Sequence, residues 1–521
     1  MSKVITAEQA AALIGDGVTI GASTQGMAGW AEEVAIAIEK RFLETGHPRD
    51  ITLVHSCTCG DYKQRGTTRL GYEGLTRRLV CGHTLTSPNM IRLIEENKIE
   101  CYLLPQGVIC QLWRAIAGKK VGVITSVGLG TYVDPRIDGG KVTAVTSEDL
   151  VKLIEVEGRE MLLYKPFPVH VALIRGTVAD ENGNLNMDNE PVIMEALPLA
   201  MAAKNSGGIV IAQAHDLAEA HTLHPKNVKV PGALVDYVVI ASPENHHQTQ
   251  ATYYSPALAG NIRIPLHGIP PVPLDARKVI GRRAAMELAA GDIINLGVGI
   301  PAFVASTVAE EGVSQRVTVT TELGIFGGVP ALDLDFGGAY NAEAMIEHAS
   351  MFDFYDGGGL DATFVGLAQV DRNVDVNVSR FGNRVAGPGG FINITQNSKK
   401  VVFCGMFAMG AESVVEDGRL RITREGKGKK FIERVEQITF SGAYATARGL
   451  PVLFVTERGV LRLSEGELEL VEIAPGVDLE RDILGMMDFR PRISPALKKM
   501  DAALFQPGWG GLEALLEARK H

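Results

Sequence analysis

The chain has 521 residues, which is too long for a single hydrophobic core, so we expect two or more domains. Hydrophobic residues make up 46% and charged residues 21%, as in an ordinary globular protein, and the 58 glycines gather near apparent strand ends rather than in repeats. The net charge of −10, without a basic block, argues against a nucleic-acid partner.

The start of the chain lacks the apolar core and cleavage site of a signal peptide, and no apolar run approaches the ~20 residues that span a bilayer. We therefore expect a cytoplasmic protein without a membrane partner. Six cysteines in so long a chain do not indicate a disulfide framework. Cys57 and Cys59 form an isolated C-x-C with no second pair and no histidine at ligand spacing, so we expect no metal site.

Local patterns in the first part of the chain predict alternating helices and strands. Apolar residues at helical spacing give way to a Gly-Asp break, a short β-branched strand and a glycine-rich loop. A second helix and a buried strand follow. These predicted segments cover residues 4–14, 15–17, 18–20, 21–29, 31–42 and 51–56.

The same order of segments returns in the second part of the chain, at residues 282–290, 291–292, 293–296, 297–301, 303–311 and 317–321. We interpret this recurrence as an internal duplication. Further apolar runs suit parallel strands buried on both faces: 209–211, 237–240, 401–403 and 452–455. The predicted fold class is α/β, with two duplicated open α/β domains and mostly parallel sheets.

A segment rich in Pro, Gly, His and Asn separates the two copies. We predict an N-terminal domain at 1–245, an interdomain connection at 246–276 and a C-terminal domain at 277–521. The tail from residue 495 onward is expected to form a short helix pair around a turn at 508–511.

Glu322 is the most distinctive candidate for chemistry. The alternating Val and Thr residues before it favour a strand, and Gly324, Gly327 and Gly328 follow in a turn that lets a ligand approach the backbone closely. Open α/β sheets bind ligands at the carboxyl ends of their strands. In the other copy His55-Ser56 takes this place, so we expect one catalytic residue per chain.

Three other glycine-rich segments are candidates for ligand binding. They are Pro105-Gln106-Gly107, Gly297-Val298-Gly299-Ile300-Pro301 and Gly387-Pro388-Gly389-Gly390-Phe391. Each alone indicates only a turn. The second lacks the third glycine of a dinucleotide-binding fingerprint, which argues against a nicotinamide cofactor.

Taken together and in order, these motifs match a known family. The combination of T-E-L-G-x-x-G-G-V-P-A, G-V-G-I-P, G-P-G-G-F-I-N-I and P-Q-G resembles the family I coenzyme A transferases, most closely the fused single-chain branch that includes propionate and acetate CoA-transferases. The resemblance implies coenzyme A as a substrate rather than a permanently bound cofactor. It also implies acyl-CoA and short-chain carboxylic acids as partners, and a homo-oligomer, expected to be a tetramer.

The same resemblance assigns roles to residues. Glu322 would be the nucleophile that carries a glutamyl-CoA thioester. Gln106 and the Gly390 amide would stabilise the oxyanion, with Gly389 as the nearby alternative. Because Gln106 and Glu322 come from opposite halves of the chain, we expect the site in a cleft between domains. Residues implied to lie against CoA are Gly297, Gly299, Gly387, Gly389, Gly327 and Gly328.

Elementary chemistry agrees with this role for Glu322. A carboxylate is ionised at pH 7 and needs no general base, and covalent catalysis divides one difficult step into easier ones. Two alternatives remain open from the residues. An acyl-CoA hydrolase would use the same glutamate, with water in place of the second carboxylate. A non-catalytic CoA-binding sensor or subunit is the other, and the intact Glu322 argues against it.

Overall fold

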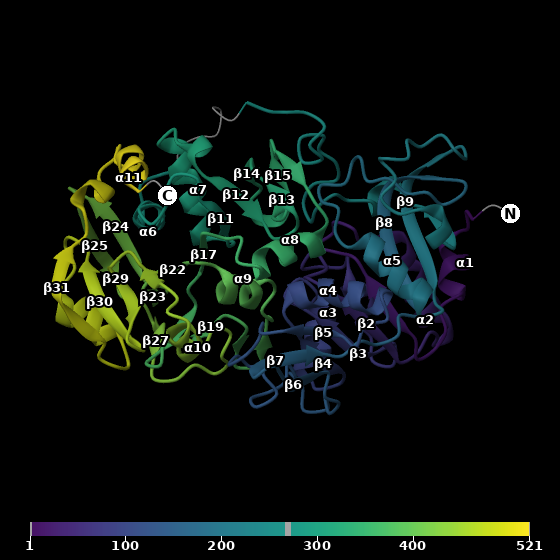
Figure 1. Cartoon of the computed structure of the whole chain (residues 1–521), viewed down its shortest axis with the longest axis horizontal. Helices are drawn as coiled ribbons and strands as arrows, with labels where there is room; N and C mark the ends of the chain where they lie inside the picture. Colours follow the sequence, from purple (N-terminus) through teal and green to yellow (C-terminus); the bar gives the residue numbers. More distant parts are fainter. Residues whose placement is uncertain (1–2, 266–271, 520–521) are drawn as a thin grey trace. The chain divides into compact units, whose positions relative to one another are not determined.

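Figure 1 shows the computed structural model, which describes residues 3–265 and 272–519. The chain divides into two compact units, and neither is one continuous stretch. The first comprises Met1–Ile264, Glu322–Asp353 and Ser379–Asn393; the second comprises Pro265–Thr321, Phe354–Val378 and Ile394–His521. The domains predicted at 1–245 and 277–521 were defined by the repeated order of segments, whereas these units are defined by compactness. The predicted domain bounds therefore stay a prediction. Pro270 and Pro271 of the predicted connection lie outside the described residues.

A seven-stranded sheet forms the centre of the first unit, and all of its strand pairs are parallel. Its inner strands are apolar on both faces, which explains the unbroken runs of Val, Ile, Leu and Ala in their sequences. In spatial order the strands are β10 (Tyr237–Ile240), β9 (Ile209–Ala218), β8 (Val171–Asp180), β1 (Thr19–Ala22), β2 (Ile51–His55), β3 (Thr76–Cys81) and β4 (Glu100–Leu103).

Helix α1 packs against α2 and α4 packs against α5, and α5 also covers β8 and β9 (Figure 1). Their ends follow local signals. A capping box between Thr6 and Gln9 starts α1, and α2 ends at Gly46, whose φ of 73° few other residues adopt. The helices are α1 (Ala7–Ala12), α2 (Glu32–Thr45), α3 (Pro88–Glu95), α4 (Gln106–Ala117) and α5 (Ala196–Asn205).

Short strands complete the first unit. An antiparallel sheet joins β5 (Val123–Thr125), β7 (Arg159–Tyr164) and β6 (Val151–Val156), and three antiparallel pairs join β13 (Ile325–Phe326) with β16 (Ala344–Met345), β14 (Val329–Pro330) with β15 (Ala339–Tyr340), and β20 (Arg380–Phe381) with β21 (Arg384–Val385).

The second unit is built on a second sheet. The strands from β12 to β28 pair in parallel, the β28–β29 and β29–β30 pairs are antiparallel, and the β30–β31 pair is parallel. Its apolar core lies between this sheet, α6, α7 and α11. The strands run β12 (Thr318–Thr321), β11 (Ile293–Leu296), β17 (Ala362–Gly366), β22 (Val401–Cys404), β28 (Val452–Val455), β29 (Gly459–Ser464), β30 (Glu467–Ile473) and β31 (Arg492–Lys499).

The remaining elements between residues 276 and 518 are short, and α8 and α9 among them begin in the first unit. The helices are α6 (Ala276–Ala285), α7 (Phe303–Glu310), α8 (His348–Asp356), α9 (Phe391–Asn397), α10 (Gly442–Ala447) and α11 (Leu512–Ala518). The minor strands are β18 (Gln369–Asp371), β19 (Val376–Asn377), β23 (Ala408–Met409), β24 (Glu412–Glu416), β25 (Arg419–Arg424), β26 (Gly428–Lys429) and β27 (Phe431–Ile432).

The predicted α/β class with mostly parallel sheets is confirmed. The recurring order of elements is also present, as α1-β1-α2-β2 and α6-β11-α7-β12. Thr19 of β1 lies opposite Thr52, and Ile293 of β11 lies opposite Thr318. Four residues after these partners come Ser56 and Glu322, so the two occupy equivalent positions in the two copies.

Two local predictions were wrong. The helix predicted at 282–290 runs from Ala276 to Ala285 instead, because Asp275 accepts a hydrogen bond from the Lys278 amide and caps the helix earlier. The prediction for the tail was wrong only in its first part: residues 492–499 form strand β31, whereas a 3₁₀ helix at Ala502–Phe505 and helix α11 lie on either side of the expected turn at 508–511. Pairing with β30 decides the conformation of β31.

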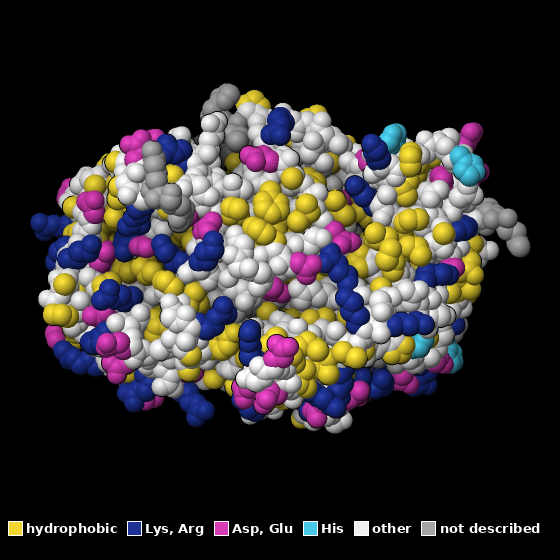
Figure 2. All heavy atoms as spheres, viewed as in Figure 1, with side chains coloured by type: hydrophobic (Ala, Val, Ile, Leu, Met, Phe, Trp, Pro, Cys, Tyr) yellow, Lys and Arg dark blue, Asp and Glu magenta, His cyan; other side chains and the backbone are white. Residues whose placement is uncertain are grey.

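No helix in residues 3–265 and 272–519 is long and apolar enough to cross a membrane. On the face shown in Figure 2, basic and acidic side chains are interspersed rather than separated by sign.

Candidate functional site

Gln106 opens helix α4, directly after β4 and the turn at Leu104-Pro105. Its side chain is fully buried, and its backbone N–H donates to the Gly389 carbonyl at 2.9 Å. The next residue must be glycine, because a Cβ at Gly107 would overlap the ring of Phe352 and lie 2.6 Å from Asn393 Nδ2. The P-Q-G motif therefore places a polar side chain where three chain segments meet.

The G-P-G-G loop lies against Gln106 and the end of β3. The Gly389 N–H donates to the Gly82 carbonyl at 2.8 Å, and the Thr84 N–H donates to the Ala386 carbonyl at 2.9 Å. Gly387 and Gly389 have φ values of 91° and 51°, which favour glycine, and Gly390 is buried just before α9. The structure thus brings Gln106 together with the loop that contains Gly389 and Gly390.

Glu322 is the first residue after β12 and begins a tight turn into β13. Gly324, with φ of 105°, accepts a hydrogen bond from the Ile346 N–H at 2.8 Å, and a side chain there would overlap the Ile346 carbonyl. Gly327 and Gly328 also have positive φ and turn the chain from β13 to β14. The glycines around half-buried Glu322 therefore shape its turn, and they belong to the first unit, as Gln106 does.

Cys57 lies near enough to Glu322 for the charge of the carboxylate to affect its thiol. Burial raises the pKa of the Cys57 thiol well above its usual value, and the negative charges of Glu322 and Glu195 raise this pKa further. His55, two residues earlier, contacts the Cys57 carbonyl through Nδ1. Burial lowers the pKa of His55 to about 4, so this ring is neutral at pH 7. The Cys57 thiol near Glu322 is therefore protonated and carries no charge at neutral pH.

A chain of buried polar side chains lies behind Gln106. Its Nε2 lies 2.9 Å from Nε2 of His348, the first residue of α8, and Nδ1 of His348 lies 2.9 Å from Oε2 of Glu195. All three side chains are 0% exposed. The His348 N–H donates to the carbonyl of Met194, which precedes Glu195 and has a φ of 53°, unusual for a residue other than glycine.

Helix α4 and the first turns of α8 are joined along their length. Arg114 forms ion pairs with Glu347, at 2.8 Å, and with Asp353, while Gln111 Nε2 donates to Asp353 at 3.1 Å. Gln106, Cys110 and Arg114 are spaced four residues apart and so lie on one face of α4. These contacts hold the register between Gln106 and His348.

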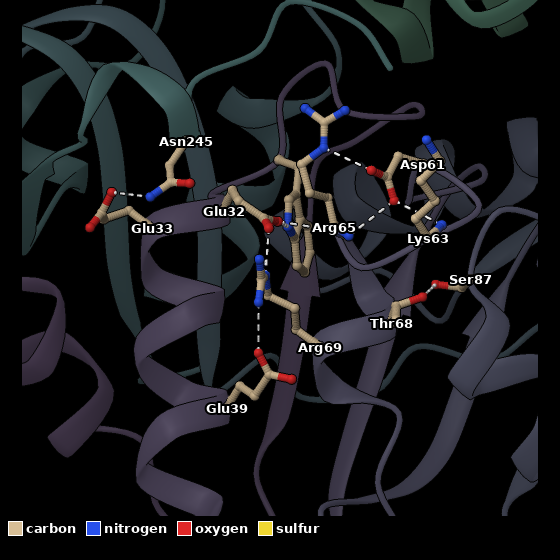
Figure 3. A network of polar contacts seen from close by, with 12 residues as sticks. Glu32, Glu33, Glu39, Asp61, Lys63, Arg65, Thr68, Arg69, Ser87 and Asn245 are labelled. Carbon is tan, nitrogen blue, oxygen red and sulfur yellow. Dashed lines mark hydrogen bonds and ion pairs between the residues drawn. The ribbon is translucent and has the colours of Figure 1, made fainter. Parts of the chain in front are cut away.

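A network of ion pairs and hydrogen bonds holds the segment after β2 against the start of α2 (Figure 3). Buried Glu32 accepts hydrogen bonds from Arg69 Nε at 2.5 Å, from Trp30 Nε1 at 2.8 Å and from the Gly66 N–H at 3.0 Å. Arg69 also donates to Glu39 at 2.8 Å. The segment containing Cys57 is thereby positioned.

The same segment is tied to neighbouring loops. Arg65 pairs with Asp61 at 2.9 Å (Figure 3). Arg65 also donates to the Gln250 carbonyl at 2.8 Å. The Gly26 N–H donates to the Thr58 carbonyl at 2.8 Å, so the first glycine loop pairs with residues 58–60. The loop at 21–29 and the segment at 57–66 therefore form one hydrogen-bonded assembly.

The structure places Gly297 and Gly299 in the second unit, between β11 and α7. The Gly297 N–H donates to the Phe364 carbonyl at 2.8 Å. Gly299 has a φ of 83°, and a Cβ added to it would meet no other atom within 4 Å, so its loop is open on that side. These two glycines belong to the second unit, whereas Gln106, Gly389 and Glu322 belong to the first.

Among the described residues, one group of side chains has metal-ligand chemistry: Cys110, Glu195 and His348, whose ligand atoms lie within 4.8 Å of one another. Such a donor set suits Zn²⁺. In the structure, however, Nδ1 of His348 is engaged by Glu195 Oε2 at 2.9 Å and lies 3.4 Å from Cys110 Sγ. A nitrogen that donates a hydrogen bond has no lone pair left for a metal.

Glu195, His348 and the role of Cys57 were not predicted from sequence. Each of the first two is a single polar residue without a motif around it. The buried His55-Ser56-Cys57 run stands out in the sequence only as the counterpart of Glu322. The positive φ of Met194 is a signal that the structure alone supplies.

A family model and several known proteins are similar to this chain. A family model described as "Coenzyme A transferase" matches residues 4–241. A caffeate CoA-transferase of Acetobacterium woodii is 54% identical over 522 residues, which cover 99% of this chain and 100% of the relative. The acetate CoA-transferase YdiF of Escherichia coli K12 is 42% identical over 479 residues, which cover 91% of this chain and 90% of the relative.

A crystal structure shows the same fold. The acyl-CoA transferase YdiF of Escherichia coli O157:H7, in a thioester complex with CoA, superposes with a TM-score of 0.92 at 39% identity. The match covers 98% of this chain and 97% of that one.

Proposed function

Because this chain belongs to the coenzyme A transferase family, we propose that it transfers CoA from a short-chain acyl-CoA to a free carboxylate through a covalent glutamyl-CoA thioester on Glu322. The observation that supports this most is the position of Glu322 in a turn shaped by glycines, within the same unit as Gln106 and the Gly387–Gly390 loop. The thioester complex of the related YdiF supports a covalent intermediate.

The proposed reaction proceeds by successive acyl transfers. A carboxylate oxygen of Glu322 attacks the thioester carbonyl carbon, and CoA thiolate leaves with the electrons of the C–S bond. The resulting acyl-glutamyl anhydride is attacked by the thiolate at the glutamyl carbonyl, which releases the first acid and leaves glutamyl-CoA. A second carboxylate then reverses the sequence. No net proton transfer is needed, so Glu322 requires no general base.

Each attack creates a tetrahedral oxyanion that needs hydrogen-bond donors. We assign the Gln106 side-chain amide and the Gly390 N–H to this role, with the Gly389 N–H as the alternative. The Gly389 N–H already donates to the Gly82 carbonyl, which favours Gly390. Removal of one such donor typically raises the barrier by about 2.7–4 kcal/mol.

Coenzyme A enters this scheme as a substrate, and no permanently bound cofactor is required. Gly297, Gly299, Gly327, Gly328 and Gly387 stay proposed CoA contacts, because close approach to a backbone without side chains suits a long, narrow ligand. We place the enzyme in the cytoplasm, where free acyl-CoA and carboxylates are its partners.

The test is direct detection of the intermediate. The protein is incubated with acyl-CoA alone, treated with hydroxylamine or borohydride, and digested for mass spectrometry. We expect a modification on the peptide containing Glu322. Glu322→Ala should show none and should lose at least about 10⁴-fold in exchange rate, as for removal of a covalent nucleophile. Glu343→Ala serves as the matched control. It removes an exposed carboxylate just before β16, the strand that pairs with β13 after Glu322.

The same experiment separates the alternatives. A transferase passes CoA on only to a second acid, with which it forms a new thioester. Steady turnover should therefore require acetate, propionate, butyrate or caffeate in a carboxylate panel. Steady CoA release without any acid would identify a hydrolase, and binding without modification would identify a sensor. Full exchange activity in Glu322→Ala would refute the proposed function.

A further inference from the structure

The strongest unassigned feature is the buried chain from Glu195 through His348 to Gln106. Glu195 and His348 lie outside the glycine motifs, yet His348 contacts a residue of the proposed site directly. The three side chains come from α4, α8 and the residue before α5, and none is exposed. Polar groups at such depth are normally retained only where all are hydrogen-bonded or where they serve a function.

Glu195 determines the protonation of the His348 ring. An ionised carboxylate can only accept, so in this pairing Nδ1 of His348, 2.9 Å from Glu195 Oε2, is the ring nitrogen that carries the proton. In a neutral imidazole the opposite nitrogen then has a lone pair and no proton. Nε2 of His348 is therefore an acceptor, and it faces Gln106.

The ring in turn determines the orientation of the Gln106 amide. An acceptor at Nε2 attracts the amide N–H₂ at 2.9 Å and repels the amide oxygen, so it disfavours the flipped side chain. One N–H is used by His348 and one remains. This orientation leaves the amide oxygen unsatisfied, because Oε1 of Gln106 is buried without a hydrogen-bond partner among the described residues.

Hydrogen bonds and ion pairs fix the backbone that carries the Gln106 side chain. The Gln106 N–H donates to Gly389, the Gly107 N–H donates to Asn393 Oδ1 at 3.1 Å, and α4 is joined to α8 through Arg114. The turn of Glu322 shares this frame, since the Ile346 N–H bonded to Gly324 lies two residues before His348. Gln106 and the Glu322 turn are thus anchored to the same short segment.

From this arrangement we propose that Glu195 and His348 are positioning residues, which hold the Gln106 amide with its second N–H as the oxyanion donor. The inference rests on the proposed function, because it assumes that Gln106 acts on the reacting carbonyl. His348 touches Gln106 and would act through that side chain. Cys110 packs beside the ring at 3.4 Å and completes its enclosure.

Two substitutions at His348 separate orientation from mere packing. In His348→Gln, the side-chain amide oxygen can occupy the place of Nε2 and accept from Gln106, whereas the contact with Glu195 is lost. In His348→Asn, the amide nitrogen can occupy the place of Nδ1 and donate to Glu195, whereas the contact with Gln106 is lost. The two variants differ by one methylene in size and in which hydrogen bond survives.

The experiment measures kcat and KM for acyl-CoA in these variants, in Gln106→Leu and in the double variant Gln106→Leu/His348→Asn. We expect His348→Asn to lower kcat about 10- to 100-fold, as is usual for residues that orient a group at a reacting centre, with KM changed less than about twofold, since the donor acts in the transition state. His348→Gln should recover most of kcat. The double variant should be no slower than Gln106→Leu, because the two residues act as one unit.

Several results would overturn the proposal: equal losses in the two His348 variants, a further loss of kcat in the double variant, or zinc bound in stoichiometric amount and released by His348→Asn. If His348→Asn does not fold, as judged by its melting temperature, His348→Gln and Glu195→Gln carry the same comparison. Failure of the proposed function is distinct: Gln106→Leu would then keep full kcat, or Glu322 would form no thioester in the parent protein.

Discussion

Cys57 and Glu322 illustrate how burial assigns reactivity to one of two possible nucleophiles. The thiolate, not the thiol, is the reactive form of cysteine. Burial and the Glu322 charge both raise the Cys57 pKa, so the thiol stays protonated beside the carboxylate. The thiol is therefore not a competing nucleophile at neutral pH, which agrees with the proposed role of Glu322.

His55 yields a prediction at the same scale. Its pKa falls to about 4 in the folded protein, through burial, from an ordinary value of 6.5. Between these values the unfolded chain binds a proton that the native ring does not, so this contribution to stability is full above pH 6.5 and is lost as the pH falls toward 4. A shift of this size corresponds to about 3 kcal/mol.

Urea unfolding at pH 7 and at pH 5 measures this effect. The parent protein should lose stability on acidification, and His55→Asn, which cannot titrate, should lose less by about 2 kcal/mol, the share of the shift completed by pH 5. His83 has a pKa of about 4 for the same reason and should maintain part of the slope in both proteins. An identical pH dependence in the two proteins would show that His55 is not buried neutral.

Among the elements, the contact between α2 and the segment after β2 depends on a mostly buried ion pair. The Glu32 side chain is 1% exposed and that of Arg69 is 20% exposed (Figure 3). Burial raises the pKa of Glu32 in spite of the Arg69 charge. Removal of a charged partner leaves the buried carboxylate uncompensated, which costs more than the pair itself contributes.

We predict that Arg69→Met lowers the free energy of unfolding by about 2 kcal/mol, less than for a fully buried pair because Arg69 is partly exposed. The double variant Glu32→Gln/Arg69→Met removes the stranded charge and keeps acceptors for Trp30 and Gly66, so it should be more stable than Arg69→Met alone. Denaturant unfolding of the four proteins completes the cycle. A double variant less stable than Arg69→Met would contradict this explanation.

The sequence was most informative about elements with strong local signals. The strands at β1, β2, β11 and β12 and the breaks around them were predicted within a few residues, since β-branched runs and glycines act locally. Strand β31 was missed, because its residues Arg492 to Lys499 have no alternating apolar pattern and adopt a strand through pairing with β30. Tertiary pairing decided what propensity did not.

For the whole molecule, the family resemblance implies a homo-oligomer, and we expect a tetramer. Size-exclusion chromatography with light scattering measures its mass directly, against a chain mass of 55.9 kDa. The peak should correspond to four chains and keep that mass on dilution through the assay range. A monomer with full exchange activity would contradict this expectation.

The amino-acid sequence by itself determined the alternation of helices and strands, the duplication, the family and the position of Glu322 after a strand, because these depend on neighbours along the chain. The tertiary structure alone decided which polar groups meet. Gln106 and His348 are 242 residues apart and Glu195 and His348 are 153 apart, and no local pattern marks any of these contacts. Burial favours a hydrogen-bond partner for each such side chain, but only the folded chain decides which partner is within reach.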